Sequence, residues 1–234
     1  MHGKNRVVAM HPLTMKDKLI KETSFPAKHF TTLKSAGNMK DDRVRSSFLI
    51  SQNLNPENLV LARQVHGAGV CAVTSADKGK IIENCDALIT SDKDVLLGIF
   101  TADCMPVLMV CENGAKAAVH AGWKGLAAGI IENTLKALEK EFGANPAEIT
   151  VYIAPHIQEC CYEVSRDFEK VFKKPLKNGR FSLGDTAAEI LKKNGVRKVF
   201  VSPDCTMHNK DLFFSYRRDK AEERQMTIVT AIKN

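Results

Sequence analysis

Residues 94–125 read DVLLGIFTADCMPVLMVCENGAKAAVHAGWKG. Two continuous apolar runs, at 94–101 and 106–111, are typical of strands that are buried on both faces. Asn113-Gly114 then separates the second run from residues 115–120, and Asn-Gly between two apolar runs predicts a tight hairpin with positive φ at both turn residues. This hairpin would bring the start of one strand, just after Cys104, beside the end of the next, at His120.

The rest of the chain alternates between short apolar runs and amphipathic segments. Before this region, strands are expected at 6–10, 28–32, 58–65, 70–74 and 85–90, with a helix at 43–54. After it, we expect helices at 125–142, 165–174 and 182–194, strands at 149–154, 196–201 and 225–232, and an apolar strand at Phe213-Phe214. Strands outnumber helices and occur both in hairpins and in helix-linked units. This pattern predicts one mixed α/β domain over residues 1–234, with residues 1–24 as its least determined segment.

Composition places the chain among ordinary globular proteins. It has 234 residues, 44% of them hydrophobic and 26% charged, which excludes disordered, collagen-like and coiled-coil classes. The formal net charge is +7, but the longest like-charge runs are pairs such as Lys173-Lys174, and aromatic residues make up only 6%. These features disfavour nucleic acid as a partner and favour a small anionic substrate such as phosphate.

The cysteines indicate a reducing compartment. Seven cysteines, an odd number without any CxxC pair, argue against a disulfide framework. The first 22 residues contain no secretory signal pattern, and no apolar run approaches the about 18 residues that span a bilayer. We therefore expect a cytoplasmic protein without a membrane partner, and a monomer. Cys160 and Cys161 are expected to be buried thiols rather than ligands.

Three segments carry side chains suited to metal binding. They are QVHG at 64–67, TADCMP at 101–106 and VHAGWKG at 119–125. Each places one ligand at a strand terminus, namely His66, Cys104 or His120. Two histidines and one thiolate match the three protein ligands of catalytic zinc, with a fourth position left for water or substrate. The same residues are also compatible with hydrogen-bonded structural histidines and a core thiol, or with Cys104 as a nucleophile and His120 as its base.

Basic residues near these segments suggest an anion site. The turn at 121–125 opens into the predicted helix, so backbone N–H groups and Lys124 could attract phosphate. In FFSYRRD at 213–219, Arg217 and Arg218 could grip phosphate bidentately. The alternatives are a plain strand-to-helix turn and a surface network of arginine with aspartate.

These motifs together resemble a known family. The runs QVHG, CDALIT, TADCMPVLMV, AAVHAGWKGL, CCYEV, CT and FFSYRRD occur in the order of the YfiH-type laccase-like domain family, over about residues 25–234. That family was first labelled polyphenol oxidase and later described as purine nucleoside phosphorylase with adenosine deaminase activity. The resemblance implies a four-layer α/β/β/α sandwich with mixed sheets. It also implies a zinc-dependent enzyme that takes phosphate and a purine nucleoside such as adenosine, inosine or methylthioadenosine.

The resemblance also implies roles for individual residues. His66, Cys104 and His120 match the family's metal-binding and catalytic residues. Asp86, Arg217 and Arg218 match further family positions and are weaker candidates for binding substrate or phosphate, together with Lys124 and Arg45. Lys124 stands where the family usually has arginine, which keeps the charge but loses the bidentate fork. The family's Gly-Gly-x-Ser and Ser-Leu-Asn-Leu segments are missing between Phe30 and Asp42, which leaves Arg45 as the match to its next arginine.

Other functions stay open at this point. A copper-dependent phenol oxidase commonly uses His-x-His pairs, and none of the seven histidines forms one, so zinc is favoured over copper. A cysteine hydrolase or deamidase would use Cys104 as its nucleophile. The shortened N-terminal region is compatible with a non-catalytic domain that binds a metal or a nucleotide.

Overall fold

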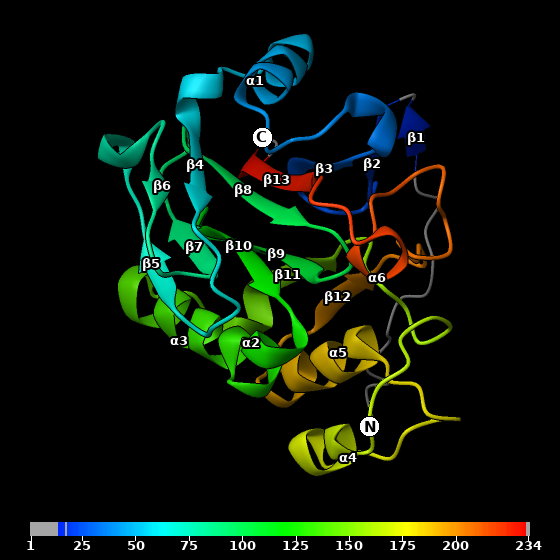
Figure 1. The fold of residues 1–234 in the computed structure, drawn as a ribbon. Coiled ribbons are helices and arrows are strands. Elements are labelled where there is room, and N and C mark those ends of the chain that lie inside the picture. The colour runs from blue at the N-terminus through cyan, green and yellow to red at the C-terminus, as the bar shows by residue number, and fades with distance from the viewer. Residues whose placement is uncertain (1–13, 17, 233–234) are drawn as a thin grey trace.

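The computed structural model of the protein describes residues 14–16 and 18–232. Its first sheet has seven strands in the order β1-β2-β3-β13-β8-β4-β6 (Figure 1). These strands are β1 (Thr14–Lys16), β2 (Leu19–Lys21), β3 (Ala27–Thr32), β13 (Gln225–Ile232), β8 (Leu96–Thr101), β4 (Leu59–Ala62) and β6 (Ile81–Ile82). The sheet is mixed, because β4 runs parallel to both β8 and β6 while the other pairs are antiparallel.

The second sheet has six strands in the order β12-β11-β9-β10-β7-β5. They are β12 (Lys198–Val201), β11 (Ile149–Ile153), β9 (Met105–Cys111), β10 (Lys116–Ala121), β7 (Ala87–Thr90) and β5 (Val70–Ala72). The central strands β9 and β10 are buried at every position, as their continuous apolar runs predict. This sheet is also mixed, with parallel pairs at both of its edges.

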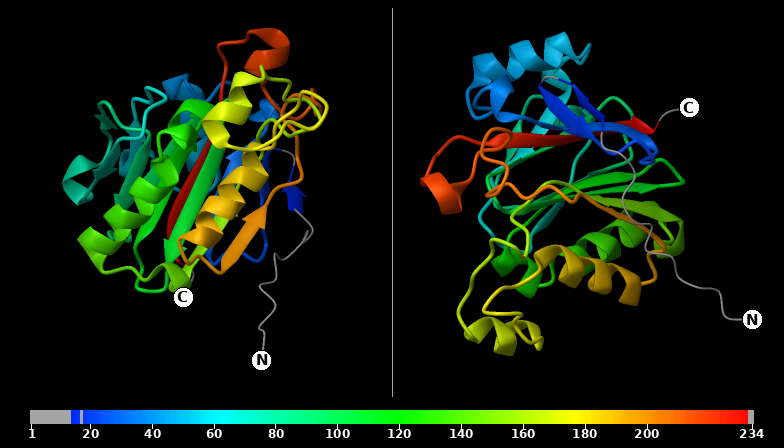
Figure 2. Two further views of the ribbon diagram at one scale, coloured as in Figure 1. Left: turned by 90° about the horizontal axis from the view of Figure 1, so that it is seen from below. Right: turned by 90° about the vertical axis from the view of Figure 1, so that its right-hand side faces the viewer.

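Helices cover the outer faces of the two sheets, except for the short helix at 216–219, which lies at one end of the sandwich (Figure 2). They are α1 (Asp42–Ser51), α2 (Trp123–Ala127), α3 (Ile130–Phe142), α4 (Asp167–Phe172), α5 (Leu183–Lys193) and α6 (Tyr216–Asp219), with short 3₁₀ turns at 34–36, 56–58, 75–77 and 146–148. One apolar cluster joins α3 and α5 to the second sheet, another joins the two sheets, and a third joins α1 to the first sheet. Three cores separate four layers, so the predicted α/β/β/α sandwich with mixed sheets is confirmed.

The predicted hairpin is present, and its register positions the site. Val119 pairs with Val107 and Ala121 pairs with Met105, so the residues that follow β10 lie beside those that precede β9. The turn differs from the prediction, because only Gly114 has a positive φ, of 94°. Asn113 instead accepts a hydrogen bond from the backbone N–H of Ala115 through its side-chain oxygen (3.1 Å). The two strands are therefore joined by a three-residue turn that ends in a left-handed glycine, and not by the predicted two-residue turn.

One predicted strand is shorter than expected, and one predicted helix is interrupted. The strand expected over 58–65 ends at Ala62, because the backbone N–H groups of Val65 and His66 bond to the Asp86 carboxylate rather than to a neighbouring strand. The helix expected over 125–142 is broken by Gly129, whose φ of 84° separates α2 from α3. Glycine accommodates this left-handed conformation without the steric cost that a side chain imposes.

The prediction of a strand at Phe213-Phe214 was wrong. These residues are buried in an extended connection, and Ser215 then caps the short helix α6 by accepting a hydrogen bond from the N–H of Arg218. The strand expected at 6–10 lies outside the described residues. In the described part of the chain, no helix is long and apolar enough to span a bilayer.

His156 lies directly after β11 and is completely buried. Its Nδ1 is 2.8 Å from the carbonyl oxygen of Ala154, which makes Nδ1 the protonated ring nitrogen. Its Nε2 points to Gly184, where an added Cβ would lie only 3.0 Å away. Burial lowers the pKa of His156 to about 4, so the folded protein holds this imidazole neutral.

Acid is therefore expected to destabilise the protein through His156. The unfolded chain binds a proton on this residue below pH of about 6.5, whereas the folded protein does so only near pH 4, so stability falls as the pH falls between these values. The loss is on the order of 3 kcal/mol. Urea unfolding at pH 7 and 4.5 should show that His156→Asn costs much less stability at the lower pH. A parallel loss of stability in both proteins would contradict this role.

Candidate metal centre

Three side chains from separate strand ends converge on one point. His66 follows β4, Cys104 lies between β8 and β9, and His120 is near the end of β10. One ligand atom from each lies within 4.8 Å of the other two. The rings of His66 and His120 are nearly perpendicular, at 85°, with centroids 4.8 Å apart. His66 is exposed, Cys104 is half-buried and His120 is buried, so the cluster opens to solvent on one side.

Two glycines allow this close approach. A Cβ at Gly122 would lie 3.1 Å from the Cys104 sulfur and 3.4 Å from the His66 ring. A Cβ at Gly125 would lie 2.6 Å from the carbonyl oxygen of Gly67, a distance that real side chains do not tolerate. The sequence HAGWKG therefore serves packing, since the turn after β10 presses against both other ligand segments.

Asp86 organises two of the three side chains. Its buried carboxylate accepts hydrogen bonds from the backbone N–H groups of Val65, His66 and Gly67, at 3.2, 2.9 and 2.7 Å. The same carboxylate lies 2.7 Å from Nδ1 of His120. His66 has a φ of 60°, a left-handed conformation that this carboxylate holds in place. Asp86 thus sets the path of one ligand segment and the orientation of another ligand ring.

The charges in the cluster support one another. Burial by itself would raise the pKa of the Cys104 thiol, but hydrogen bonds with His120 and His66 outweigh it and lower the pKa to about 6. Burial would lower the pKa of His120, but its bonds to Asp86 and Cys104 raise it to about 9. Burial opposes ionisation of Asp86 as well, and the His120 ring and the Gly67 N–H hold its pKa below the usual range. At neutral pH, Cys104 is therefore a thiolate, the form that binds metals and attacks electrophiles.

Asp103, beside Cys104, was not singled out by sequence reasoning. Its φ is 90°, and its carboxylate accepts hydrogen bonds from the hydroxyls of Thr206 (2.7 Å) and Ser215 (3.0 Å) and from the N–H of Arg217 (2.7 Å). Its backbone carbonyl accepts from the N–H of Ile157 (3.0 Å). These partners hold the strained residue that positions Cys104. The only feature of the sequence that pointed to Asp103 was its position in a polar break between two strands. Its partners could not be found from the sequence, because they lie more than fifty residues away along the chain.

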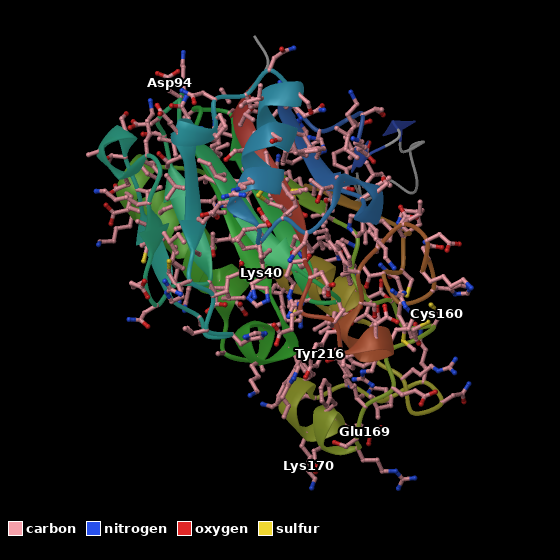
Figure 3. All side chains as sticks on the ribbon, turned by 45° about the horizontal axis from the view of Figure 1, so that its top comes forward. Lys40, Asp94, Cys160, Glu169, Lys170 and Tyr216 are labelled. Atoms are coloured by element: carbon pink, nitrogen blue, oxygen red, sulfur yellow. The ribbon has the colours of Figure 1, made fainter. Side chains whose placement is uncertain are left out.

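Two adjoining cavities open at the cluster. One, of ≈ 350 Å³, is lined by the three ligands together with Gln64, Phe100, Thr101, Ala102, Tyr216 and Arg224. The other, of ≈ 370 Å³, shares His66, Gln64, Phe100 and Arg224 and adds Lys40, Arg45 and Arg63 among its lining residues. Figure 3 shows Lys40 and Tyr216 on the same face of the molecule. Cavities of this size suit a small organic ligand, and the second is rich in positive charge.

The structure separates the basic residues expected from the sequence. Arg45 lines the second cavity, and its guanidinium bonds to Asp42 and to the carbonyl oxygen of Met39 (2.9 Å). Lys124 is exposed and lies over the Trp123 ring, and it lines neither cavity. Six hydrogen bonds join the Arg218 guanidinium to the carbonyl oxygens of Thr206, Met207 and Phe213 and to Asp219.

Arg217 also has structural partners. Its side chain donates a hydrogen bond to the carbonyl oxygen of Glu163 (2.9 Å) and lies over the Tyr162 ring, while its N–H bonds to Asp103. Arg217 and Arg218 thus hold loops together around the cluster. Phosphate binding by Lys124, Arg217 and Arg218 stays a prediction, and among the predicted basic residues only Arg45 lines one of the two cavities described above.

Comparison with known proteins agrees with the motifs. The family described as multi-copper polyphenol oxidoreductase laccase matches residues 27–232. The chain belongs to this family. It is 42% identical over 151 residues to a purine nucleoside phosphorylase of Aquifex aeolicus, covering 63% of this chain and 71% of that protein. It is 31% identical over 189 residues to purine nucleoside phosphorylase YfiH of Escherichia coli, covering 76% and 75% of the two chains.

Solved structures share the fold of this laccase-family protein. YlmD from Geobacillus stearothermophilus superposes with a TM-score of 0.88 at 25% identity, covering 94% of this chain and 99% of that one. The Bacillus licheniformis protein YfiH superposes with a TM-score of 0.87 at 23% identity, covering 96% and 100%. Both likenesses extend over nearly the full length of this chain and of the two solved structures.

The donor set of the cluster fits a metal ion. Two imidazoles and one thiolate are ligands of borderline softness, which suit zinc and also copper. The Asp86 carboxylate beside His120 is the outer partner that metal-binding histidines commonly have. A multicopper oxidase would need several copper sites rich in histidine. Among the described residues, neither group of possible metal ligands contains more than two histidines, so the donor set does not support that reading.

The reactivity of Cys104 provides a direct test of this electrostatic arrangement. In metal-free protein, the rate of its alkylation by iodoacetamide should change less than about twofold between pH 6.5 and 8.5, because the thiolate already predominates. Exposed Cys160, whose pKa is raised, should react roughly tenfold faster for each pH unit. Mass spectrometry of the labelled peptides separates the two rates. A similar steep pH dependence at Cys104 would contradict the lowered pKa.

Proposed function

We propose that this protein is a zinc-dependent purine nucleoside phosphorylase that also deaminates adenosine. The observation that carries the proposal is the cluster of His66, Cys104 and His120 at the junction of the two cavities. Relatives that are named purine nucleoside phosphorylase support the reaction class. Bound zinc would supply Lewis-acid polarisation of a substrate oxygen and a lowered pKa for water, which serve phosphorolysis and deamination respectively.

The side chains suggest how each substrate would bind. Arg45, Arg63, Arg224 and Lys40 surround the second cavity, where their charges would hold phosphate. The first cavity offers the Phe100 and Tyr216 rings to a purine base and ribose. In phosphorolysis, a phosphate oxygen bonds to C1′ while the C1′–N9 bond breaks, and its electron pair goes to N9, which then takes up a proton. The protein's contribution is to position the two reactants and to stabilise the cationic sugar in the transition state.

Product analysis distinguishes the two activities. Purified protein is incubated with adenosine or inosine, with and without phosphate, and the products are resolved by chromatography. Phosphorolysis gives free base and ribose 1-phosphate only with phosphate present, whereas deamination converts adenosine to inosine without it. The absence of both products from metal-loaded protein would refute the proposal.

Arg45 is expected to contribute to phosphate binding. Arg45→Gln should raise the KM for phosphate about tenfold and change the KM for nucleoside little, because it removes a guanidinium from the cationic cavity. Arg43→Gln is the matched control, since Arg43 is exposed on the same helix and does not line this cavity. Steady-state kinetics with each substrate varied in turn measures both constants. Equal changes from the two substitutions would contradict the assignment.

A cysteine hydrolase is the second candidate function. The observation in its favour is the chain of contacts from Cys104 through His120 to Asp86, together with the lowered pKa of the thiol. Chelation separates the two candidates. Removal of metal should abolish phosphorolysis and zinc should restore it, whereas a thiolate nucleophile would be more reactive without metal and would be blocked by zinc.

A further inference from the structure

A second cluster of thiols and imidazole lies on another part of the surface. The ligand atoms of Cys160, Cys161 and His208 lie within 4.8 Å of one another, the same closeness that the first cluster shows. The two thiol sulfurs are 3.5 Å apart. Cys160 and His208 are exposed and Cys161 is half-buried, so the expectation that both cysteines are buried was wrong. Figure 3 shows Cys160 at the periphery, apart from Lys40, which lines the cationic cavity.

A third thiol lies against this cluster from the interior. Buried Cys205 raises the pKa of both Cys160 and Cys161, although its sulfur is not one of the three ligand atoms within 4.8 Å of one another. The N–H of Gln158 donates a hydrogen bond to its sulfur at 3.4 Å, which orients this thiol. Cys205 and His208 stand in the spacing Cys-x-x-His, which lets one turn of backbone direct two side chains to one ion.

The two loops that carry these residues are held together independently of any metal. The backbones of Cys205 and His156 pair in an isolated parallel β-bridge, and the N–H of Thr206 donates a hydrogen bond to the carbonyl oxygen of His156 (3.1 Å). The Gln158 amide donates to the carbonyl oxygen of Ser202 (3.2 Å). The charge of Arg180, which acts on Cys160, is paired with Glu163 at 3.3 Å. The donors are therefore brought together by the fold, and the cation beside them is neutralised.

We propose that Cys160, Cys161 and His208 form a second metal site that binds zinc, with a shift of the neighbouring Cys205 side chain supplying the fourth donor. Three thiolates and one imidazole are a common ligand set of four-coordinate structural zinc. Binding displaces the thiol protons into solvent and forms sulfur–zinc bonds, without any change of oxidation state. The metal would fasten the loop before α4 to the loop before α6. Both loops bond to Asp103, through Ile157 and Thr206, so the site would support the residue that positions Cys104.

Metal counting on the full chain tests the proposal. Reduced, metal-free protein is titrated with Zn²⁺ against a chromophoric chelator, and Co²⁺ is used in parallel to follow the sulfur-to-cobalt absorption. The wild-type protein should bind one more equivalent of Zn²⁺ than either Cys160→Ser or His208→Asn. Cys71→Ser, a thiol outside both clusters, should bind as the wild type does. Zinc should also raise the Tm of the wild type by about 5 °C more than that of Cys160→Ser.

The outcome is independent of the proposed function. In Cys104→Ala protein, whose first cluster lacks its thiol, Cys160→Ser should still remove one equivalent of Zn²⁺ and part of the cobalt absorption. Equal metal content in the wild type and in both second-cluster variants would overturn the second site, whatever the activity of the enzyme. Loss of metal from Cys71→Ser would overturn it as well, because the metal would then depend on general folding.

Discussion

Cys104→Ala is expected to lose the metal of the first cluster and to lower kcat/KM for phosphorolysis by on the order of 10³-fold or more. The substitution removes the only sulfur among the three proposed ligands and also one of the two anions, Asp86 and Cys104, that raise the pKa of His120 in the metal-free protein. Elemental analysis gives the metal content, and chromatography of free base gives the rate. Two neutral imidazoles alone bind zinc much more weakly than they do with a thiolate.

The controls separate chemistry from folding. Cys71→Ala removes a thiol of similar partial exposure outside the cluster and should leave both metal and rate unchanged. Cys104→Ala should retain the wild-type Tm under metal-free conditions to within a few degrees, because its side chain is half-buried and small. A variant that keeps its metal and stays within tenfold of the wild-type rate would rule out Cys104 as a ligand and as a nucleophile.

Asp86→Asn should have the second-largest effect, although Asp86 is not expected to touch substrate. An amide cannot replace the carboxylate that accepts three backbone N–H bonds and faces Nδ1 of His120. Its NH₂ group would point at N–H donors in a buried site. We expect a loss of stability on the order of 3 kcal/mol, and a 10–100-fold loss of zinc affinity because the orientation of both histidines is relaxed.

Asp92→Asn is the matched control for this substitution. Asp92 also accepts bonds from a backbone N–H and a hydroxyl, both of Ser75, but it is only half-buried and does not contact the cluster. Its replacement should cost about 1 kcal/mol. Urea unfolding of metal-free protein measures stability, and competition with a chelator measures zinc affinity. If Asp86→Asn bound zinc as tightly as Asp92→Asn, the positioning role would be disproved.

The two aspartates mark the limit of what local patterns reveal. Asp86 and Asp103 are both placed in short polar breaks between apolar strands, and nothing in the sequence distinguishes them from turn residues. Their partners lie between 19 and 114 residues away along the chain. The family resemblance pointed to Asp86 only as a weaker candidate for binding substrate or phosphate, not as the partner of His120, and Asp103 had no signal of its own. Long-range hydrogen bonds have no periodicity, so no pattern in the sequence predicts them.

The same limit applies to the arginines. Arg217 and Arg218 carry the charge expected of a phosphate site, yet their guanidinium groups bond to backbone carbonyl oxygens of neighbouring loops. Arg63 and Arg224 line the second cavity of the candidate site, but the sequence patterns did not identify them as candidates for phosphate binding. Charge is visible in the sequence, but the direction of a long side chain depends on which acceptors the fold places around it.

By itself, the sequence determined a mixed α/β domain and the three segments that carry His66, Cys104 and His120, while the layered sandwich was implied by the family resemblance. Apolar runs of strand length dictate burial on both faces, and the turn at 112–114 sets the hairpin register that brings Cys104 beside the end of β10. Only the tertiary structure decided which charged groups face the cluster, and that Cys160, Cys161 and His208 gather at a second one. Strand periodicity is a local property of the chain. The meeting of loops some forty residues apart depends on the packing of whole sheets and helices.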